Sequence, residues 1–322
     1  MPTRRSFIEH FLKGAGCFAL AASLPPQVLA EQTLPRKLTF PQGIASGDPT
    51  ASSVVLWTRA LPAENQKEVL FQCEVAEDAS FQKTVTRRSI SANSEMDYTV
   101  RILVHDLQPD RVYFYRFQAG TFTSPTGRTR TAPAPDNPRP VRFAWASCQS
   151  YEAGFFGAYR TLLNRDQKAE PDQQIEFLLH TGDFIYEKLG YGSTRNLPEF
   201  PSGGQFLEGE EYPFAATLED YRHLYKIYLA DPDLQAARAR WPFINTWDDH
   251  EFSNDCWQSM ATYTPEGSPS QKRKVAANKA WFEFIPAFLS GNPGVSQVDQ
   301  NAHDFSTPAP KVENAPFQGP AA

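Results

Sequence analysis

The densest group of side chains that could bind a metal ion lies in residues 248–255. Six of these eight positions carry an ionisable or amide group: Asp248, Asp249, His250, Glu251, Asn254 and Asp255. Neighbouring carboxylates cannot all ionise without compensating positive charge, and a multivalent cation is the simplest source of that charge. The alternative is an acidic surface loop, which fits poorly with the apolar and aromatic residues around the group. These residues are Phe243, Ile244, Trp247, Phe252 and Trp257.

A second polar group follows the apolar residues 175–180. Gly182 lets the backbone turn sharply there, and Asp183 then presents a carboxylate whose two oxygens can bridge two cations. Tyr186 lies three residues later and points to the same side if the segment forms a helical turn. An ordinary turn remains the other interpretation of this pattern.

Cys148 follows a third apolar segment, residues 141–146. Its thiolate could be a metal ligand or a nucleophile, and a buried structural cysteine is the plainer alternative. A cysteine hydrolase would pair Cys148 with His180 or His250, but no evident motif supplies an oxyanion site or substrate specificity.

These three groups stand at the ends of predicted strands. Residues 141–146, 175–180 and 243–247 are the expected strands, and the predicted helices alternate with them at 155–167, 218–229, 233–240 and 270–289. Such alternation predicts a layered α/β domain over residues 141–290, in which functional groups collect at the carboxyl ends of the strands.

The preceding residues, 37–134, have a different pattern. Period-two alternation in residues 53–58, 69–75, 97–103 and 111–117 predicts a β-sandwich of the immunoglobulin or fibronectin type. Four prolines between Pro133 and Pro140 make a stiff spacer, so we expect the domain boundary there. Residues 291–322 are expected to form an irregular tail.

Residues 1–30 resemble a twin-arginine signal peptide. Arg4-Arg5 precede a weakly hydrophobic stretch, and small residues end at Ala30. The stretch is far below the roughly 20 residues that span a bilayer, so no stable membrane span is expected. We therefore expect the twin-arginine export machinery as a partner and a periplasmic or secreted location. The net charge of −6 argues against nucleic-acid binding through phosphate contacts.

Together the motifs resemble those of the PhoD-like alkaline phosphatases. The matching segments, in the order of that family, are residues 40–49 with 55–59, 146–149, 180–187 and 247–255. The resemblance implies a fibronectin-like N-terminal domain followed by a calcineurin-like metallophosphoesterase domain of the αββα type.

The resemblance also implies an iron and calcium site that hydrolyses phosphate esters. Cys148, Asp183 and Tyr186 would correspond to ligands of Fe³⁺, with Asp183 bridging toward Ca²⁺. Asp248 or Asp249, together with Asn254 or Asp255, would supply further ligands, and His250 would lie near the leaving group. A metal-activated water or hydroxide would then attack phosphorus, and small phosphate esters would be the substrates.

One departure concerns the C-terminal region. Family members supply further Asp, Asn and His ligands from later strands, and no equivalent follows Leu289. His303-Asp304 has no expected strand before it to position the pair. The resemblance therefore predicts a chain truncated at its C-terminus, and the competing hypothesis is a catalytically inactive fragment that acts as an extracellular binding or packing module.

Overall fold

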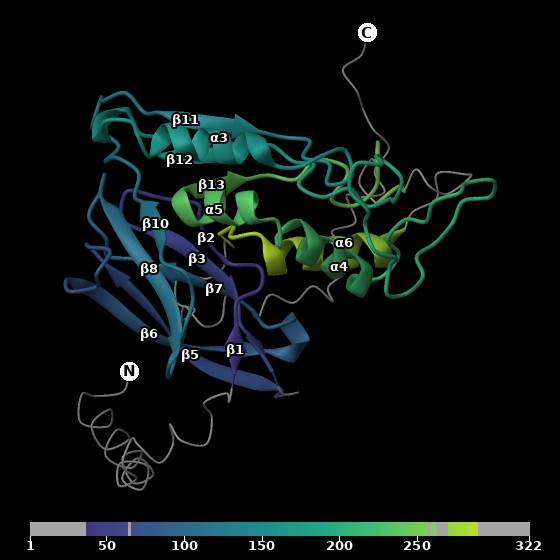
Figure 1. Cartoon of the computed structure of the whole chain (residues 1–322), viewed down its shortest axis with the longest axis horizontal. Coiled ribbons are helices and arrows are strands. Elements are labelled where there is room, and N and C mark those ends of the chain that lie inside the picture. The colour runs from purple at the N-terminus through teal and green to yellow at the C-terminus, as the bar shows by residue number, and fades with distance from the viewer. Residues whose placement is uncertain (1–36, 64–65, 257–258, 262–269, 289–322) are drawn as a thin grey trace, which may run out of the picture.

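The structure, a computed structural model, describes residues 37–63, 66–256, 259–261 and 270–288 (Figure 1). The expected signal peptide, the expected tail and Trp257 lie outside these residues. None of the helices within the described ranges combines the length and the apolar character that crossing a bilayer requires.

One sheet has five strands and is built from residues 68–130. Its order is β10–β8–β5–β6, with β9 paired to β8, and all pairs are antiparallel. The strands are β5 (Glu68–Ala76), β6 (Thr84–Asn93), β8 (Val112–Ala119), β9 (Phe122–Thr123) and β10 (Gly127–Arg130). A small separate pair joins β1 (Leu38–Thr39) to β4 (Leu61–Pro62).

The other sheet has six strands in the order β11–β12–β13–β2–β3–β7. They are β2 (Ile44–Gly47), β3 (Val54–Arg59), β7 (Thr99–Val104), β11 (Phe143–Ala146), β12 (Phe177–His180) and β13 (Pro242–Asn245). The pairs β11–β12, β12–β13 and β13–β2 are parallel, whereas the pairs β2–β3 and β3–β7 are antiparallel. Because β13 pairs with β2, this sheet joins segments on both sides of residues 131–140. The division into a sandwich and an αββα domain stays a prediction.

Helices in the described ranges accompany the sheets, and their ends follow from capping. They are α3 (Gly157–Asp166), α4 (Leu218–Tyr228), α5 (Pro232–Arg240) and α6 (Gln271–Phe284), with short 3₁₀ turns at Ser94–Met96 and Pro171–Gln173. Thr217 and Asp220 form a capping box at the start of α4. Asp231 caps α5, whose first residue is a proline. Proline is tolerated there because the N–H that it lacks would have no partner within the helix.

Two apolar cores lie on opposite faces of the six-stranded sheet. The first is filled from β2, β3 and β7 on one side and from β5, β6 and β8 on the other, and Cys73 is buried within it. The second contains Trp57 of β3, Phe243 of β13 and the apolar faces of α3 to α6. The indole N–H of Trp57 donates to the carbonyl of Glu283 in α6 over 2.7 Å, which ties β3 to that helix layer.

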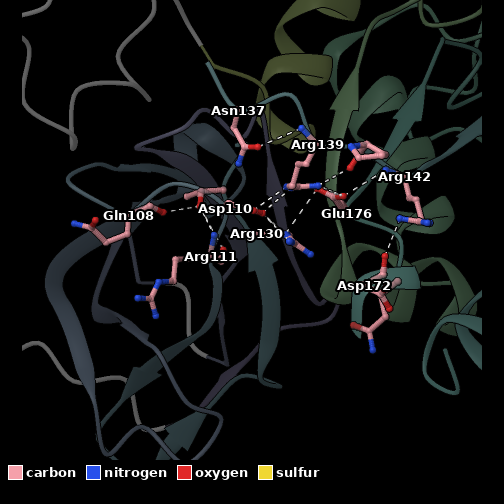
Figure 2. A network of polar contacts seen from close by, with 12 residues as sticks. Gln108, Asp110, Arg111, Arg130, Asn137, Arg139, Arg142, Asp172 and Glu176 are labelled. Atoms are coloured by element: carbon pink, nitrogen blue, oxygen red, sulfur yellow. Dashed lines mark hydrogen bonds and ion pairs between the residues drawn. The ribbon is translucent and has the colours of Figure 1, made fainter. Parts of the chain in front are cut away.

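The proline-containing segment is held by an ion-pair network (Figure 2). Arg139 donates to both carboxylate oxygens of Asp110, over 2.6 and 2.8 Å, and to both oxygens of Glu176, over 2.7 and 2.6 Å. Arg130 of β10 donates to the same Asp110 over 2.6 Å. Because Asp110 precedes β8 and Glu176 precedes β12, one arginine side chain links the two sheets.

We expect the Arg139→Met variant to lose stability in a pH-dependent way. Burial raises the pKa of Asp110 and of Glu176, but hydrogen bonds from arginines outweigh burial and hold both pKa values below their ordinary range. The network therefore stabilises the folded state above about pH 4.5, and the contribution is lost as the pH falls through the folded pKa values. Urea unfolding at pH 7 should show that the free energy of unfolding falls by about 1–2 kcal/mol. The loss is no larger because part of the network is exposed to solvent.

The matched control for this prediction is Arg160→Met. Arg160 makes a comparable ion pair with Asp233, but its side chain is 63% exposed, so its loss should change stability little at any pH. If Arg139→Met lowered the free energy of unfolding equally at pH 3 and pH 7, the stabilisation could not come from the ionised carboxylates of Asp110 and Glu176.

Candidate metal centre

The three sequence-predicted groups meet at the carboxyl ends of β11, β12 and β13. The backbone N–H of Cys148 donates to the carbonyl of Gly182 over 3.2 Å, and that of Gln149 donates to the carbonyl of Asp183 over 3.1 Å. Thr246 donates in the same way to the carbonyl of His180 over 3.0 Å. The segments after the strands thus continue the pairing of the sheet, which brings the three motifs side by side.

Cys148 and Asp183 both have left-handed backbone conformations. Their φ values are 54° and 53°, which non-glycine residues adopt at a cost of about 1–3 kcal/mol. The Gln149 side chain helps to fix this geometry, because it donates to the carbonyl of Phe184 over 3.0 Å and accepts from the buried hydroxyl of Tyr159 over 2.8 Å. Strain held by such contacts is typical of functional sites.

Gly182 is required between the β12 and β13 segments. Its φ is +100°, and a Cβ atom there would overlap the backbone of Asp248. We therefore expect Gly182→Ala to cost about 2–4 kcal/mol, from backbone strain together with the clash. Urea unfolding of the metal-free protein measures the cost.

Gly203 provides the matched control for that substitution. It also has a positive φ, +84°, but no atom lies within 4 Å of the position that an added Cβ would take. Gly203→Ala should therefore cost only the strain of about 1–2 kcal/mol. Equal losses in the two variants would show that the approach of Asp248 to Gly182 is unimportant.

The ligand atoms of Asp183, Asp249 and His250 lie within 4.8 Å of one another. The Tyr186 hydroxyl is 3.4 Å from Oδ2 of Asp183, and the Cys148 thiol interacts with both residues. Asp183 is 7% exposed, and its Oδ1 atom is buried without a hydrogen-bond partner among the described residues. A buried carboxylate oxygen that lacks a protein donor is suited to a cation.

The remaining predicted ligands lie at the edge of this group. Asp248 is exposed, and its charge is close enough to raise the pKa of Asp183. The backbone N–H of Asp255 donates to Oδ2 of Asp249, and the amide of Asn254 donates to Oδ2 of Asp255 over 2.8 Å. The structure therefore places Asp249 in the central group and Asp248, Asn254 and Asp255 around it.

The electrostatics disfavour negative charge in the absence of a cation. Burial raises the pKa of Asp183, and Asp249 and Asp248 raise it further against the opposing effect of Cys148 and His250. Burial and the Asp183 carboxylate also raise the pKa of Tyr186. A hydrogen bond with Ser147 lowers the pKa of the Cys148 thiol, but burial and Asp183 outweigh it and the pKa is raised. A bound cation would reverse these three effects.

Aromatic rings surround His250. The ring of Tyr186 lies 4.1 Å from the imidazole between centroids, and the ring of Tyr191 lies 5.2 Å away at 87°. The buried hydroxyl of Tyr228 accepts the backbone N–H of Tyr186 over 3.2 Å. Burial lowers the pKa of His250, but the hydrogen bond with Glu187 outweighs burial, so the pKa is raised. The sequence motifs alone do not indicate a role for Tyr191, Tyr228 or Glu187.

Glu251 is a further residue whose role the sequence does not reveal. It is 4% exposed, and its carboxylate accepts three backbone N–H groups from the segments that carry Asp183 and Asp248. Its position next to His250 is the only signal in the sequence, which does not show which acidic side chain turns inward.

The three cysteines of the described chain are free thiols. Cys73 is buried, as expected for a core residue, and Cys148 is exposed at the site. Cys256 is half-buried, with its sulfur 3.9 Å from the carbonyl oxygen of Asp249.

Comparison with known proteins agrees with this arrangement. Residues 143–301 match the family described as PhoD-like phosphatase, and residues 26–133 match the N-terminal domain of PhoD-like phosphatases. Alkaline phosphatase D of Bacillus subtilis (strain 168) is 34% identical over 315 residues, which are 93% of this chain and 51% of that protein.

A solved structure described as the structure of PhoD is similar with a TM-score of 0.66 and 34% identity, covering 83% of this chain and 49% of the other. The chain thus spans about half the length of these relatives. The two family matches together extend over the five-stranded sheet, the six-stranded sheet and all the motifs of the site. On this evidence the chain belongs to the PhoD-like phosphatase family.

Proposed function

We propose that this chain is a metal-dependent phosphoesterase that hydrolyses phosphate esters at the ends of β11, β12 and β13. The observation that carries the proposal is the convergence of Asp183, Asp249 and His250, whose ligand atoms lie within 4.8 Å of one another, together with a buried oxygen of Asp183 that has no described protein donor. Membership of the PhoD-like phosphatase family and the name of the Bacillus subtilis relative, alkaline phosphatase D, support it.

The donor set fits two different cations. Cys148, Asp183 and Tyr186 offer a thiolate, a carboxylate and a phenolate, which suit Fe³⁺. Asp183 and Asp249, with oxygen atoms from the neighbouring residues 248 and 254–255, suit Ca²⁺, which prefers oxygen ligands. When bound, these cations would neutralise the phosphate and make a water molecule more acidic.

The protein's own contribution is to orient the reacting groups. Nδ1 of His250 is held by Oε2 of Glu187 over 2.8 Å, which fixes the ring and leaves Nε2 as its second polar atom. Tyr186 and Tyr191 pack against the ring and restrict its rotation. We therefore assign His250 to the leaving-group side of the phosphate ester, where a positioned imidazole can donate a proton.

Three finer proposals accompany this function. The five-stranded sheet with β2, β3 and β7 would be the fibronectin-like sandwich, and the remaining strands and helices would belong to the αββα domain. Export by the twin-arginine machinery would place the enzyme in the periplasm or outside the cell. The substrates would be small esters rather than nucleic acids, since the net charge is −6.

The experiment is hydrolysis of p-nitrophenyl phosphate and bis(p-nitrophenyl) phosphate by the chelator-treated chain before and after addition of Fe³⁺ and Ca²⁺. We expect no release of nitrophenolate before addition, and release that requires both ions afterwards. Activity that chelation leaves unchanged would refute the metal-dependent mechanism. No observation favours the alternative of a catalytically inactive module.

A further inference from the structure

Two buried glutamates connect the metal-binding segments, which are the residues that follow β12 and β13. Each glutamate reaches from its own segment to the other one. Glu187 lies on the segment after β12 and is 0% exposed, and Glu251 lies on the segment after β13 and is 4% exposed. Neither belongs to the central group of Asp183, Asp249 and His250. Burial of a carboxylate is costly unless donors satisfy it, so the contacts of these two side chains show what they hold.

Glu251 reaches from the β13 segment to the β12 segment. Its Oε1 accepts the N–H of Phe184 over 2.5 Å, and its Oε2 accepts the N–H of Asp183 over 3.2 Å. The same Oε2 accepts the N–H of Asp248, on its own segment, over 2.7 Å. One carboxylate therefore fixes the backbone of Asp183 relative to the backbone of Asp248.

Glu187 reaches from the β12 segment back to the β13 segment. Its Oε2 lies 2.8 Å from Nδ1 of His250, and its Oε1 accepts the N–H of Asn254 over 2.7 Å. The two glutamates therefore form a reciprocal pair, in which each segment supplies one carboxylate that holds the other segment.

The site needs such a restraint because its acidic groups repel each other. Asp183 and Asp249 bring two carboxylates together, and Asp183 also has a strained backbone. Without a cation, repulsion would separate the segments, and part of the binding free energy of the cation would then be spent on ordering them. Buried carboxylates that accept hydrogen bonds from backbone N–H groups can fix the distance between the two segments before a cation binds.

We propose that Glu187 and Glu251 are positioning residues that preset the distance between the β12 and β13 ligands before metal binds. The proposal rests on the metal centre proposed above. It predicts that both carboxylates act on metal affinity without being ligands, and that their effects are coupled because they hold the same pair of segments.

The experiment titrates chelator-treated protein with Co²⁺, whose visible absorption reports ligand geometry without requiring activity. Glu187→Gln and Glu251→Gln keep the side-chain size but remove the charge and one acceptor. Each is expected to weaken Co²⁺ binding about 10–100-fold, the usual cost of losing a group that orients a ligand. The double variant should lose less than the product of the two single effects.

Glu283→Gln is the matched control. Glu283 is also a buried carboxylate, 2% exposed, but it accepts two hydrogen bonds of 2.6 Å from Arg222 in α4. Its loss should lower the thermal midpoint while Co²⁺ affinity stays within about twofold, since its described side-chain partners, Arg222 and Lys279, lie in α4 and α6. If a glutamine variant does not fold, the aspartate variant, which keeps the charge but is shorter by one methylene, is titrated with the same expectation.

The possible outcomes separate the positioning role from the metal centre. Unchanged Co²⁺ affinity in both glutamate variants, or an equal loss in Glu283→Gln, would overturn the positioning role while leaving the metal centre intact. Multiplicative effects would overturn the coupling of the two residues. Failure of the unaltered protein to take up Co²⁺ would overturn the metal centre, and the positioning role with it.

Discussion

Asp183→Ala is expected to abolish phosphoester hydrolysis, lowering kcat/KM at least about a thousand-fold, because it removes the carboxylate proposed to bridge both cations. Circular dichroism should be unchanged, since the Asp183 side chain makes few contacts that stabilise the fold and one of its oxygens has no described protein donor. The assay is the metal-reconstituted release of nitrophenolate.

Asp106→Ala is the control for this substitution. Asp106 is another aspartate with a positive φ, 62°, but it lies in an exposed turn, where its carboxylate pairs with His105. The Asp106→Ala variant should retain full activity. Retention of more than a tenth of the activity in Asp183→Ala would contradict the bridging role.

Cys148→Ala is expected to remove the strongest visible absorption of the Fe³⁺-loaded protein. A thiolate donates charge to a ferric ion, so its removal should eliminate that band, and the weaker phenolate contribution of Tyr186 should remain. Iron affinity should fall by more than the roughly 10–100-fold that loss of a group orienting a ligand costs, because here a direct ligand is lost. Ultraviolet–visible titration with Fe³⁺ measures both effects.

Cys73→Ala tests whether any thiol would produce the same change. Cys73 is 1% exposed within β5, and burial raises the pKa of its thiol well above the ordinary range, so it cannot supply a thiolate. This variant should keep the visible band and lose only stability. A band that persists in Cys148→Ala would mean that the thiol is not a ligand.

Much of the secondary structure could be predicted from periodicity. The alternating residues 111–117 became β8, and the apolar residues 175–180 became β12 at Phe177–His180. Strand β6 was missed, because much of its sequence, including Arg87 and Arg88, is polar and exposed. A strand at the edge of a sheet needs little apolar content, so its pattern carries a weak signal.

The shared six-stranded sheet could not be predicted either. The prolines of residues 131–140 correctly indicated a break in regular structure, but pairing between β13 and β2 depends on contacts nearly 200 residues apart in the chain. Arg139 illustrates the same limit, since its partners Asp110 and Glu176 become neighbours only in the fold.

At the site, the sequence could indicate the segments better than the orientation of each side chain. Cys148, Asp183 and one of the pair Asp248 and Asp249 were expected near one another because parallel strands end at one edge of the sheet. The roles of Glu187 and Glu251 remained hidden, because an inward-facing glutamate and an exposed one have the same appearance in a sequence. Burial against backbone N–H donors distinguishes them.

Anomalous diffraction at the iron absorption edge, from crystals of the chain loaded with Fe³⁺ and Ca²⁺, tests the proposed metal centre without relying on activity. We predict one iron peak bounded by Cys148, Asp183 and Tyr186, with a second, calcium site on the Asp249 side of Asp183 at oxygen distances of about 2.3–2.6 Å. An iron peak elsewhere on the protein, or none at the ends of β11 and β12, would contradict the proposed centre.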